Sequence, residues 1–184
     1  HVVTSREVLV SHIIDEAMST PPKKAAPDRK NWLLVDKEEA FAKHLAQILL
    51  ELVVQLEAEN FAIGQVSQED LLGHEKHVLE QVKDWDPWED LEVSQLEIQQ
   101  TIMRKLRAKN FLRFKTDSSG VQVTDDEAKS FYEKNRVKFG NLPFAQFRDS
   151  IKEVLAQEQL QEKLKDWFEI LKHKYRVRYL GLSG

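Results

Sequence analysis

The chain of 184 residues contains no cysteine. This absence excludes a disulfide scaffold, a thiol nucleophile and every cysteine-based metal site. Glycine and proline are scarce, with 6 and 5 residues, which argues against a turn-rich β-sandwich. No run of about 18 apolar residues occurs, so we expect no segment that spans a membrane. The first residues show neither the basic region nor the apolar stretch of a signal peptide, so we expect a mature or trimmed chain.

The residues that are abundant favour helices around a real core. Apolar residues make up 41% of the chain and charged residues 32%, a composition that suits long amphipathic helices rather than wholesale disorder. The charge is uneven, because residues 1–92 carry a net charge of −10 and residues 93–184 a net charge of +6. Two halves of opposite sign would attract and pack together. The alternative is a basic face for anionic partners.

Helix caps and apolar residues at helical spacing divide the chain into successive helices. Polar capping residues precede a Glu or Asp by three positions at several places, which is the signature of a helix N-terminus. The expected helices cover residues 5–19, 36–61, 67–82, 86–111, 125–137 and a long helix from Pro143 through Leu171. The cap of the second helix would be Asp36, with Glu39 as its partner.

Two short segments at opposite ends of the chain are typical of strands. Val177–Leu180 alternates in polarity, and Val2–Thr4 precedes the first helix. We therefore predict a mostly α fold with a long C-terminal helix and a small two-stranded pairing of the termini. Residues 1–184 would form a single helical domain, with helices in 1–115, a closing part in 121–184 and a mobile loop at about 20–31.

The sequence offers no recognisable catalytic, cofactor-binding or metal-binding set. The GxSxG, P-loop and GxGxxG motifs are absent. His74 and His77 could share one side of a helix, but a third ligand is missing and two solvated histidines explain the pair better. We therefore predict that the protein is not an enzyme and holds no cofactor or metal. An enzyme whose residues converge only in three dimensions, around His44, His74 or His77, stays open as an alternative.

A basic run and several aromatic residues are the remaining candidates for binding. The run contains Arg104, Lys105, Arg107, Lys109, Arg113 and Lys115. Phosphate contacts and stacking would suit nucleic acid, but the pI of about 5.9 favours a solvated face or a contact with the acidic half. Five aromatic side chains could line an apolar groove that binds clients, and ordinary packing in the core is the alternative. These candidate client-binding residues are Phe61, Trp85, Trp88, Phe111 and Phe114.

The order of the segments resembles the SurA-like periplasmic foldases. The clearest similarity lies in VTDDEAKSFYEKNRVKF at 123–139, followed by PFAQFRDSIKEVL at 143–155. The opening VVTSREV at 2–8, LLELVVQLEAENFAI at 49–63 and VSQEDL at 66–71 are similar to the start of that family's chaperone module. A parvulin-type isomerase domain commonly follows the tyrosine-bearing helix in this family. Here three residues separate Phe139 from Pro143, too few for a domain.

The resemblance implies a helical chaperone module without prolyl isomerase activity. Such a protein would be located in the bacterial periplasm or cell envelope and would hold unfolded outer-membrane or secreted proteins without ATP. It would need no nucleic acid and no integral membrane segment, and it could form a homodimer. The main rival hypothesis is an adaptor that binds one specific folded envelope partner through a flat interface.

Overall fold

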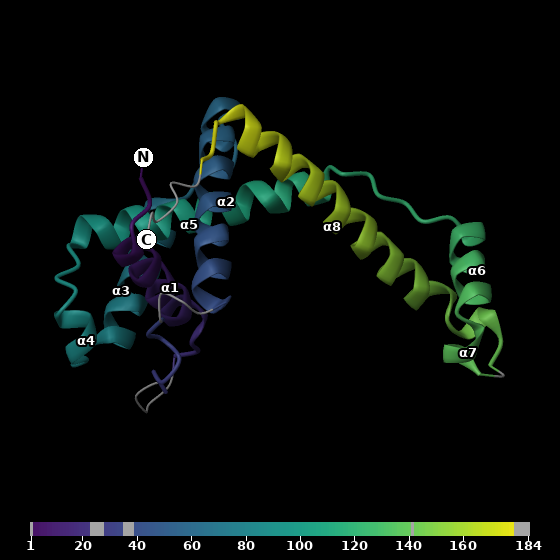
Figure 1. Ribbon diagram of the computed structural model, residues 1–184, viewed down its shortest axis with the longest axis horizontal. Coiled ribbons are helices and arrows are strands. Elements are labelled where there is room, and N and C mark those ends of the chain that lie inside the picture. Colours follow the sequence, from purple (N-terminus) through teal and green to yellow (C-terminus); the bar gives the residue numbers. More distant parts are fainter. Residues whose placement is uncertain (1, 23–27, 35–38, 141, 179–184) are drawn as a thin grey trace. The chain divides into compact units, whose positions relative to one another are not determined.

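The computed structural model describes residues 2–22, 28–34, 39–140 and 142–178. These residues form eight α-helices, one 3₁₀ turn and no strand (Figure 1), which confirms the mostly α class. The elements are α1 (Ser5–Ser19), α2 (Glu39–Phe61), α3 (Gln68–Val82), α4 (Asp86–Glu89), α5 (Gln95–Asp117), α6 (Asp125–Lys134), α7 (Arg136–Phe139), η1 (Phe144–Gln146) and α8 (Arg148–Lys174).

Three of the sequence predictions fall partly outside the described residues. The predicted pairing of the termini is not confirmed, because Val2, Val3 and Val177 are not in a strand and residues 179 and 180 lie outside the described part. The predicted cap at residue 36 also lies outside it. The same holds for residues 23–27 of the loop that was expected to be mobile.

The chain divides into two compact units, residues 1–113 and 114–184, and the boundary falls inside α5. Each unit has a hydrophobic core of its own. None of the helices in the described ranges is long and apolar enough to cross a membrane.

In the first unit, α1 packs against both α2 and α3. Local sequence signals fix where these helices begin. The hydroxyl of Thr4 accepts a hydrogen bond from the Glu7 N–H at 3.2 Å, and the Ser67 hydroxyl accepts one from the Asp70 N–H at 3.0 Å. Each cap satisfies a backbone donor that the helix leaves free, so the predicted starts of α1 and α3 are confirmed.

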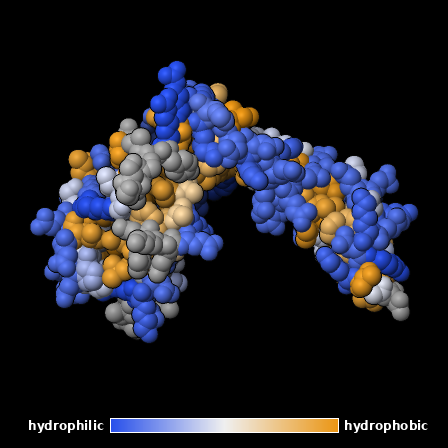
Figure 2. All heavy atoms as spheres, in the orientation of Figure 1, coloured by the Kyte–Doolittle hydropathy of each residue, from blue (hydrophilic) through white to orange (hydrophobic). Residues whose placement is uncertain are grey.

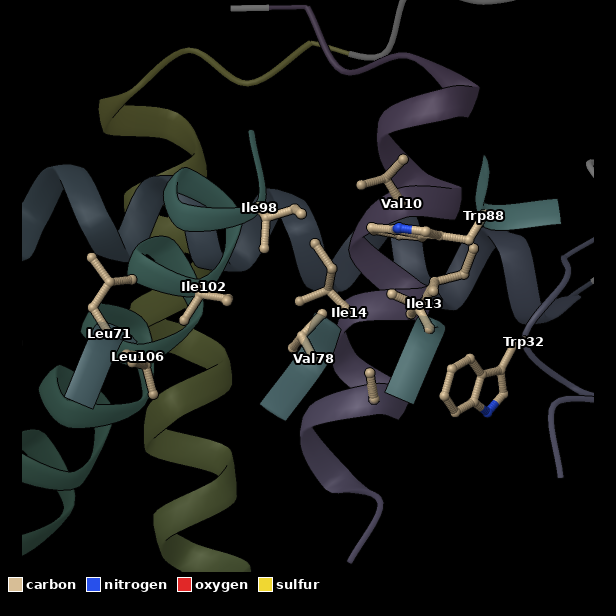
Figure 3. Packing of buried hydrophobic residues seen from close by; sticks show 12 residues of the cluster. Val10, Ile13, Ile14, Trp32, Leu71, Val78, Trp88, Ile98, Ile102 and Leu106 are labelled. Atoms are coloured by element: carbon tan, nitrogen blue, oxygen red, sulfur yellow. The ribbon is translucent and has the colours of Figure 1, made fainter. Parts of the chain in front are cut away.

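Apolar side chains from α1, α3, α4 and α5, together with Trp32, form one hydrophobic cluster of the first unit. Ile13 and Ile14 of α1 are fully buried and belong to one cluster with Val78 of α3 and Ile102 of α5, all labelled in Figure 3. At about 25 cal/mol per Å², this burial supplies the main stabilisation of the unit. The rest of the cluster consists of Val10, Ala17, Trp32, Leu71, Val82, Trp88, Ile98 and Leu106.

The prediction of one helix over 86–111 was wrong. The structure ends α4 at Glu89 and begins α5 at Gln95, with Glu92 between them at a positive φ of 47°. A second cap explains the break, because the Ser94 hydroxyl accepts a hydrogen bond from the Glu97 N–H at 3.2 Å. Asp86 does not cap α4, since Trp85 occupies the N-cap position without a side-chain bond.

The turn that follows α2 requires a glycine. Gly64 adopts a φ of +77°, and a Cβ at this position would lie 3.0 Å from the carbonyl oxygen of Arg107. Next to it, the Asn110 side chain donates to the carbonyl of Gln65 at 3.2 Å. The turn therefore lies directly against α5 and covers Phe111.

The described part of the segment between α1 and α2 is held by Arg29. Its guanidinium Nε donates to the carbonyl of Gln81 at 3.0 Å, near the end of α3, where carbonyl groups lack partners within the helix. The same group lies 5.9 Å from the ring of Trp32 and 5.5 Å from the ring of Trp85. The two indoles meet edge to face at 5.5 Å, so one arginine connects this segment to both α3 and α4.

The second unit packs α6, α7 and η1 against the first part of α8. Its core consists of Ala128, Tyr132 and Ile151, surrounded by partly buried phenylalanines at positions 131, 139, 144 and 147. The capping box at Thr124 is complete, and its hydrogen bonds lower the pKa of Glu127. The ion pair with Lys152 of α8 lowers the pKa of Asp125.

Two predicted helix boundaries in the second unit need correction. The helix expected over 125–137 is interrupted after Lys134, where the Asn135 side chain donates to the carbonyl of Phe131 at 2.9 Å. Such side-chain bonds compete with the helical ladder. Pro143 opens a 3₁₀ turn, and the long helix α8 begins only at Arg148.

Candidate functional site

The five aromatic residues proposed to contact clients differ in their exposure. Trp88 and Phe111 are 8% and 1% exposed and belong to the interior, so neither side chain is available at the surface. Trp85 is half-buried against Trp32. Phe61 and Phe114 are exposed, at 60% and 46%, and belong to different units. The prediction of a groove lined by all five is therefore wrong for Trp88 and Phe111.

The basic run is also not a uniform solvated face. Arg104 and Lys105 are each 7% exposed and bind carboxylates from α1 and α2. Arg107 lies nearer the surface and pairs with Glu59 at 2.9 Å. Contact with the acidic half of the sequence, one of the alternatives that the sequence left open, is confirmed for these three residues.

We use the name ion-pair cluster for the polar residues that meet where α1, α2 and α5 converge. Glu51 of α2 lies at its centre, with Arg104 Nε at 3.2 Å and Lys105 Nζ at 3.0 Å. The remaining members are Glu7, Ser11 and Asp15 of α1 and Gln47 of α2. The three α1 residues are spaced four apart, so they lie on one face of that helix.

Each cation of the cluster has two acidic partners. Arg104 also donates to Glu7 at 3.2 Å and to the Ser11 hydroxyl at 3.0 Å, and Lys105 pairs with Asp15 at 3.3 Å. Moving charges out of water costs several kcal/mol per ion, which the pairs only partly offset. A cluster of this kind therefore adds little net stability. Its main effect is to determine which side chains of the three helices contact one another.

A groove lies against the cluster on the side of Arg104. Its volume is about 670 Å³, and we call it the Arg104 groove. It combines apolar and polar walls, which include amide side chains that can both donate and accept hydrogen bonds. Its apolar lining comes from Val10, Leu52, Leu71, Leu96 and Met103, and its polar lining includes Thr4, Gln55, Gln99 and Gln100.

A second groove, of about 500 Å³, adjoins the cluster on the side of Lys105. We call it the Lys105 groove. Asp15, Glu51 and Lys105 lie in its wall, and Lys109 stands exposed at its edge. Its apolar lining consists of Met18, Leu50, Leu106, Ala108 and Leu112. Both volumes fall in the range of about 300–1,000 Å³ that is usual for ligand sites.

Of the histidines that the sequence left open for an enzyme, His74 lines the Lys105 groove, whose wall also contains Asp15 and Glu51. His12 is 4% exposed, its Nε2 donates to the carbonyl of Asn31 at 3.0 Å, and its ring lies 4.1 Å from that of His44. Burial, reinforced by His12, lowers the pKa of His44. His77 donates through Nε2 to the carbonyl of Thr20 at 2.8 Å. No group of three metal-ligating side chains is found among the described residues.

Both grooves offer contacts that suit binding. The apolar patches can bury side chains, and the amides can bind a polar backbone. None of the five aromatic residues predicted from the sequence lines either groove.

Comparisons with models of protein families, with curated proteins and with solved structures found no match.

Sequence reasoning missed the residues that define the grooves. One signal was present, since the polar residues Glu7, Ser11 and Asp15 recur at spacings of four along the first helix. A second signal was Glu51, which stands inside the most apolar segment of the chain and is 6% exposed. Acidic residues on the inner faces of α1 and α2 require basic partners, and α5 provides them.

Proposed function

We propose that this protein is an ATP-independent chaperone of the SurA-like kind that holds unfolded envelope proteins and has no prolyl isomerase activity. Its location would be the periplasm or cell envelope of a bacterium, and its clients would be outer-membrane or secreted proteins. The observation that carries the proposal is the pair of grooves on either side of the ion-pair cluster. Both combine apolar and amide linings and lie on a helical scaffold.

An unfolded polypeptide presents what these grooves can bind. Its apolar side chains could be buried against leucine and methionine, and its backbone offers both N–H donors and C=O acceptors for the glutamines at the edge. Contacts of this type tolerate many sequences. Burial at about 25 cal/mol per Å² makes micromolar affinity reachable for a modest area.

The ion-pair cluster would keep the grooves open. Charges that are fixed by partners on three helices resist the collapse of α1, α2 and α5 onto one another, because any such movement would separate buried ions from their partners. A rigid groove loses less conformational entropy on binding than one that must first form. Binding to the unfolded state would then delay aggregation by mass action, without ATP.

The experiment is suppression of aggregation, followed by light scattering. A urea-unfolded outer-membrane β-barrel protein is diluted into buffer with or without an equimolar amount of the chain and without ATP. We expect reduced scattering in the presence of the chain and no acceleration of prolyl isomerisation in a peptide assay. A folded chain that leaves scattering unchanged would refute the proposal. Retention of one folded envelope protein would then favour the adaptor.

A matched pair of variants tests whether the grooves are responsible. Leu96 lines the Arg104 groove and Ile170 lies on α8 outside both grooves, yet the two side chains are equally exposed, at 63%. We expect Leu96→Asp to weaken suppression about ten-fold, since a carboxylate replaces an apolar contact. Ile170→Asp should leave suppression unchanged. Equal effects of both substitutions would contradict the assignment to the groove.

A further inference from the structure

The segment between α6 and η1 combines exposed aliphatic side chains with exposed basic ones. Val137 is 98% exposed and Leu142 is 50% exposed, values that leave both side chains in solvent. Lys134, Arg136 and Lys138 surround Val137 in the sequence and are also exposed. We call these five residues the α7 tip. Figure 2 shows apolar atoms at this end of the second unit.

The tip is held in place by the aromatic core beneath it. The Arg136 guanidinium lies 4.8 Å from the ring of Tyr132, and the Tyr132 hydroxyl donates to the carbonyl of Leu142. Tyr132 is itself 4% exposed and packs against Phe139 and Phe144. Arg136 and Leu142 therefore both contact one buried ring. The packed core beneath holds these two exposed residues in place.

The charge of this end of the unit is strongly positive. Between Ala128 and Phe147 the sequence has four basic residues and a single acidic one, Glu133. In the described part of the chain, Lys134 and Lys138 make no ion pair. The acidic residues of α6 lie in its first turn, at the opposite end of a helix about 15 Å long. That separation exceeds the distance of about 8 Å over which salt screens charges at physiological ionic strength.

We propose that the α7 tip docks on the surface of a membrane that contains anionic lipids. Val137 and Leu142 would enter the boundary between headgroups and acyl chains, while Lys134, Arg136 and Lys138 would contact the headgroups. Such contacts need both an apolar and a basic contribution, because either one alone binds only marginally. A protruding valine adds nothing to the binding of nucleic acid phosphates.

The test is sedimentation with sucrose-loaded vesicles of phosphatidylcholine, with or without phosphatidylglycerol. We expect the chain to bind the anionic vesicles, more strongly at low salt, and not the neutral ones. Each Lys or Arg near such a surface contributes about five-fold in affinity. Lys134→Glu with Lys138→Glu should therefore weaken binding at least about twenty-fold, and Val137→Asp about ten-fold.

Matched controls distinguish the tip from general charge effects. Lys163 and Lys165 are exposed lysines on α8 without an ion pair in the described structure, so their double replacement by Glu makes the same change in net charge. Ile170→Asp places the same carboxylate at another exposed aliphatic position. Both controls should bind within about two-fold of the parent. Circular dichroism confirms that each variant is folded.

Insertion is measured separately from attraction. In a Val137→Trp variant, brominated lipids should quench the added indole fluorescence beyond the quenching of the four native tryptophans in the parent chain. No binding above that to neutral vesicles, equal losses in the control variants, or binding without quenching at position 137 would overturn the proposal. The same would follow if polyglutamate or duplex DNA bound with the same dependence on Lys134 and Lys138 and none on Val137.

The proposal is independent of client binding. The tip belongs to the second unit and the grooves to the first. Leu96→Asp should weaken suppression of aggregation and leave vesicle binding unchanged, whereas Val137→Asp should do the reverse.

Discussion

Removal of Glu51 tests whether the ion-pair cluster holds α1, α2 and α5 together. Its carboxylate accepts from Arg104 Nε at 3.2 Å, Lys105 Nζ at 3.0 Å and Gln47 Nε2 at 3.1 Å, and the residue is 6% exposed. Breaking a buried pair from one side costs about 3–5 kcal/mol, because a charge is left without its partner. Here Arg104 keeps Glu7 and Ser11, which places Glu51→Ala near the lower figure, at about 3 kcal/mol.

The assay is urea unfolding followed by circular dichroism at equilibrium. The transition of the first unit should move to lower urea with an unchanged m value, which identifies a change of stability rather than of compactness. The matched control is Glu59→Ala, which removes a surface pair with Arg107 at 2.9 Å. Exposed pairs contribute about 0.2–1 kcal/mol. Equal losses in the two variants would refute the argument that burial makes the cluster structurally important.

Three further predictions follow from burial, titration and capping. The pKa of His44 is lowered in the folded chain. The neutral imidazole therefore contributes stability at a pH above its unfolded pKa of about 6.5, and this contribution is lost as the pH falls through its folded pKa. The urea midpoint should therefore decline on acidification, and it should decline less steeply in His44→Gln. Trp88→Ala should lower the free energy of urea unfolding by about 3–5 kcal/mol because the indole is in the core. Trp85→Ala should lower it clearly less. Equal losses of stability in the two variants would contradict the different burial of the two indoles. Thr124→Ala removes the hydroxyl of a complete capping box and should destabilise α6 by about 1 kcal/mol. Amide hydrogen exchange in the first turn of α6 should become faster. Unchanged exchange would contradict the role of the cap.

The sequence predicted those parts of the fold that depend on neighbouring residues. Thr4, Ser67 and Thr124 cap helices where their spacing to an acidic residue indicated. A cap requires only a side-chain oxygen and a backbone N–H three residues away, so its signal is local. The rule did not apply at Asp86, where Trp85 holds the N-cap position, and a further cap at Ser94 begins α5 within the helix expected over 86–111.

Burial depends on how distant helices meet and was harder to predict. Leu56 of α2 is apolar but 44% exposed, while Glu51 and Glu57 of the same helix are buried. Periodicity identifies a broad apolar side of a helix, but it does not determine which residues on that side are buried. The neighbouring helices determine that. Trp88 was one of the five candidate client-binding residues, with core packing as the alternative, and the core of the first unit encloses it.

Site-specific photo-crosslinking tests the central claim, binding of unfolded clients in the grooves, most directly. A photoreactive amino acid replaces either Gln100, which lines the Arg104 groove, or Gln157, an equally polar exposed residue of α8 outside both grooves. Each variant is irradiated with a urea-diluted outer-membrane β-barrel protein or with its folded form. We predict crosslinks from position 100 to the unfolded client alone and few from position 157. Equal crosslinking at both positions, or crosslinking to the folded form, would contradict binding of unfolded clients in the groove.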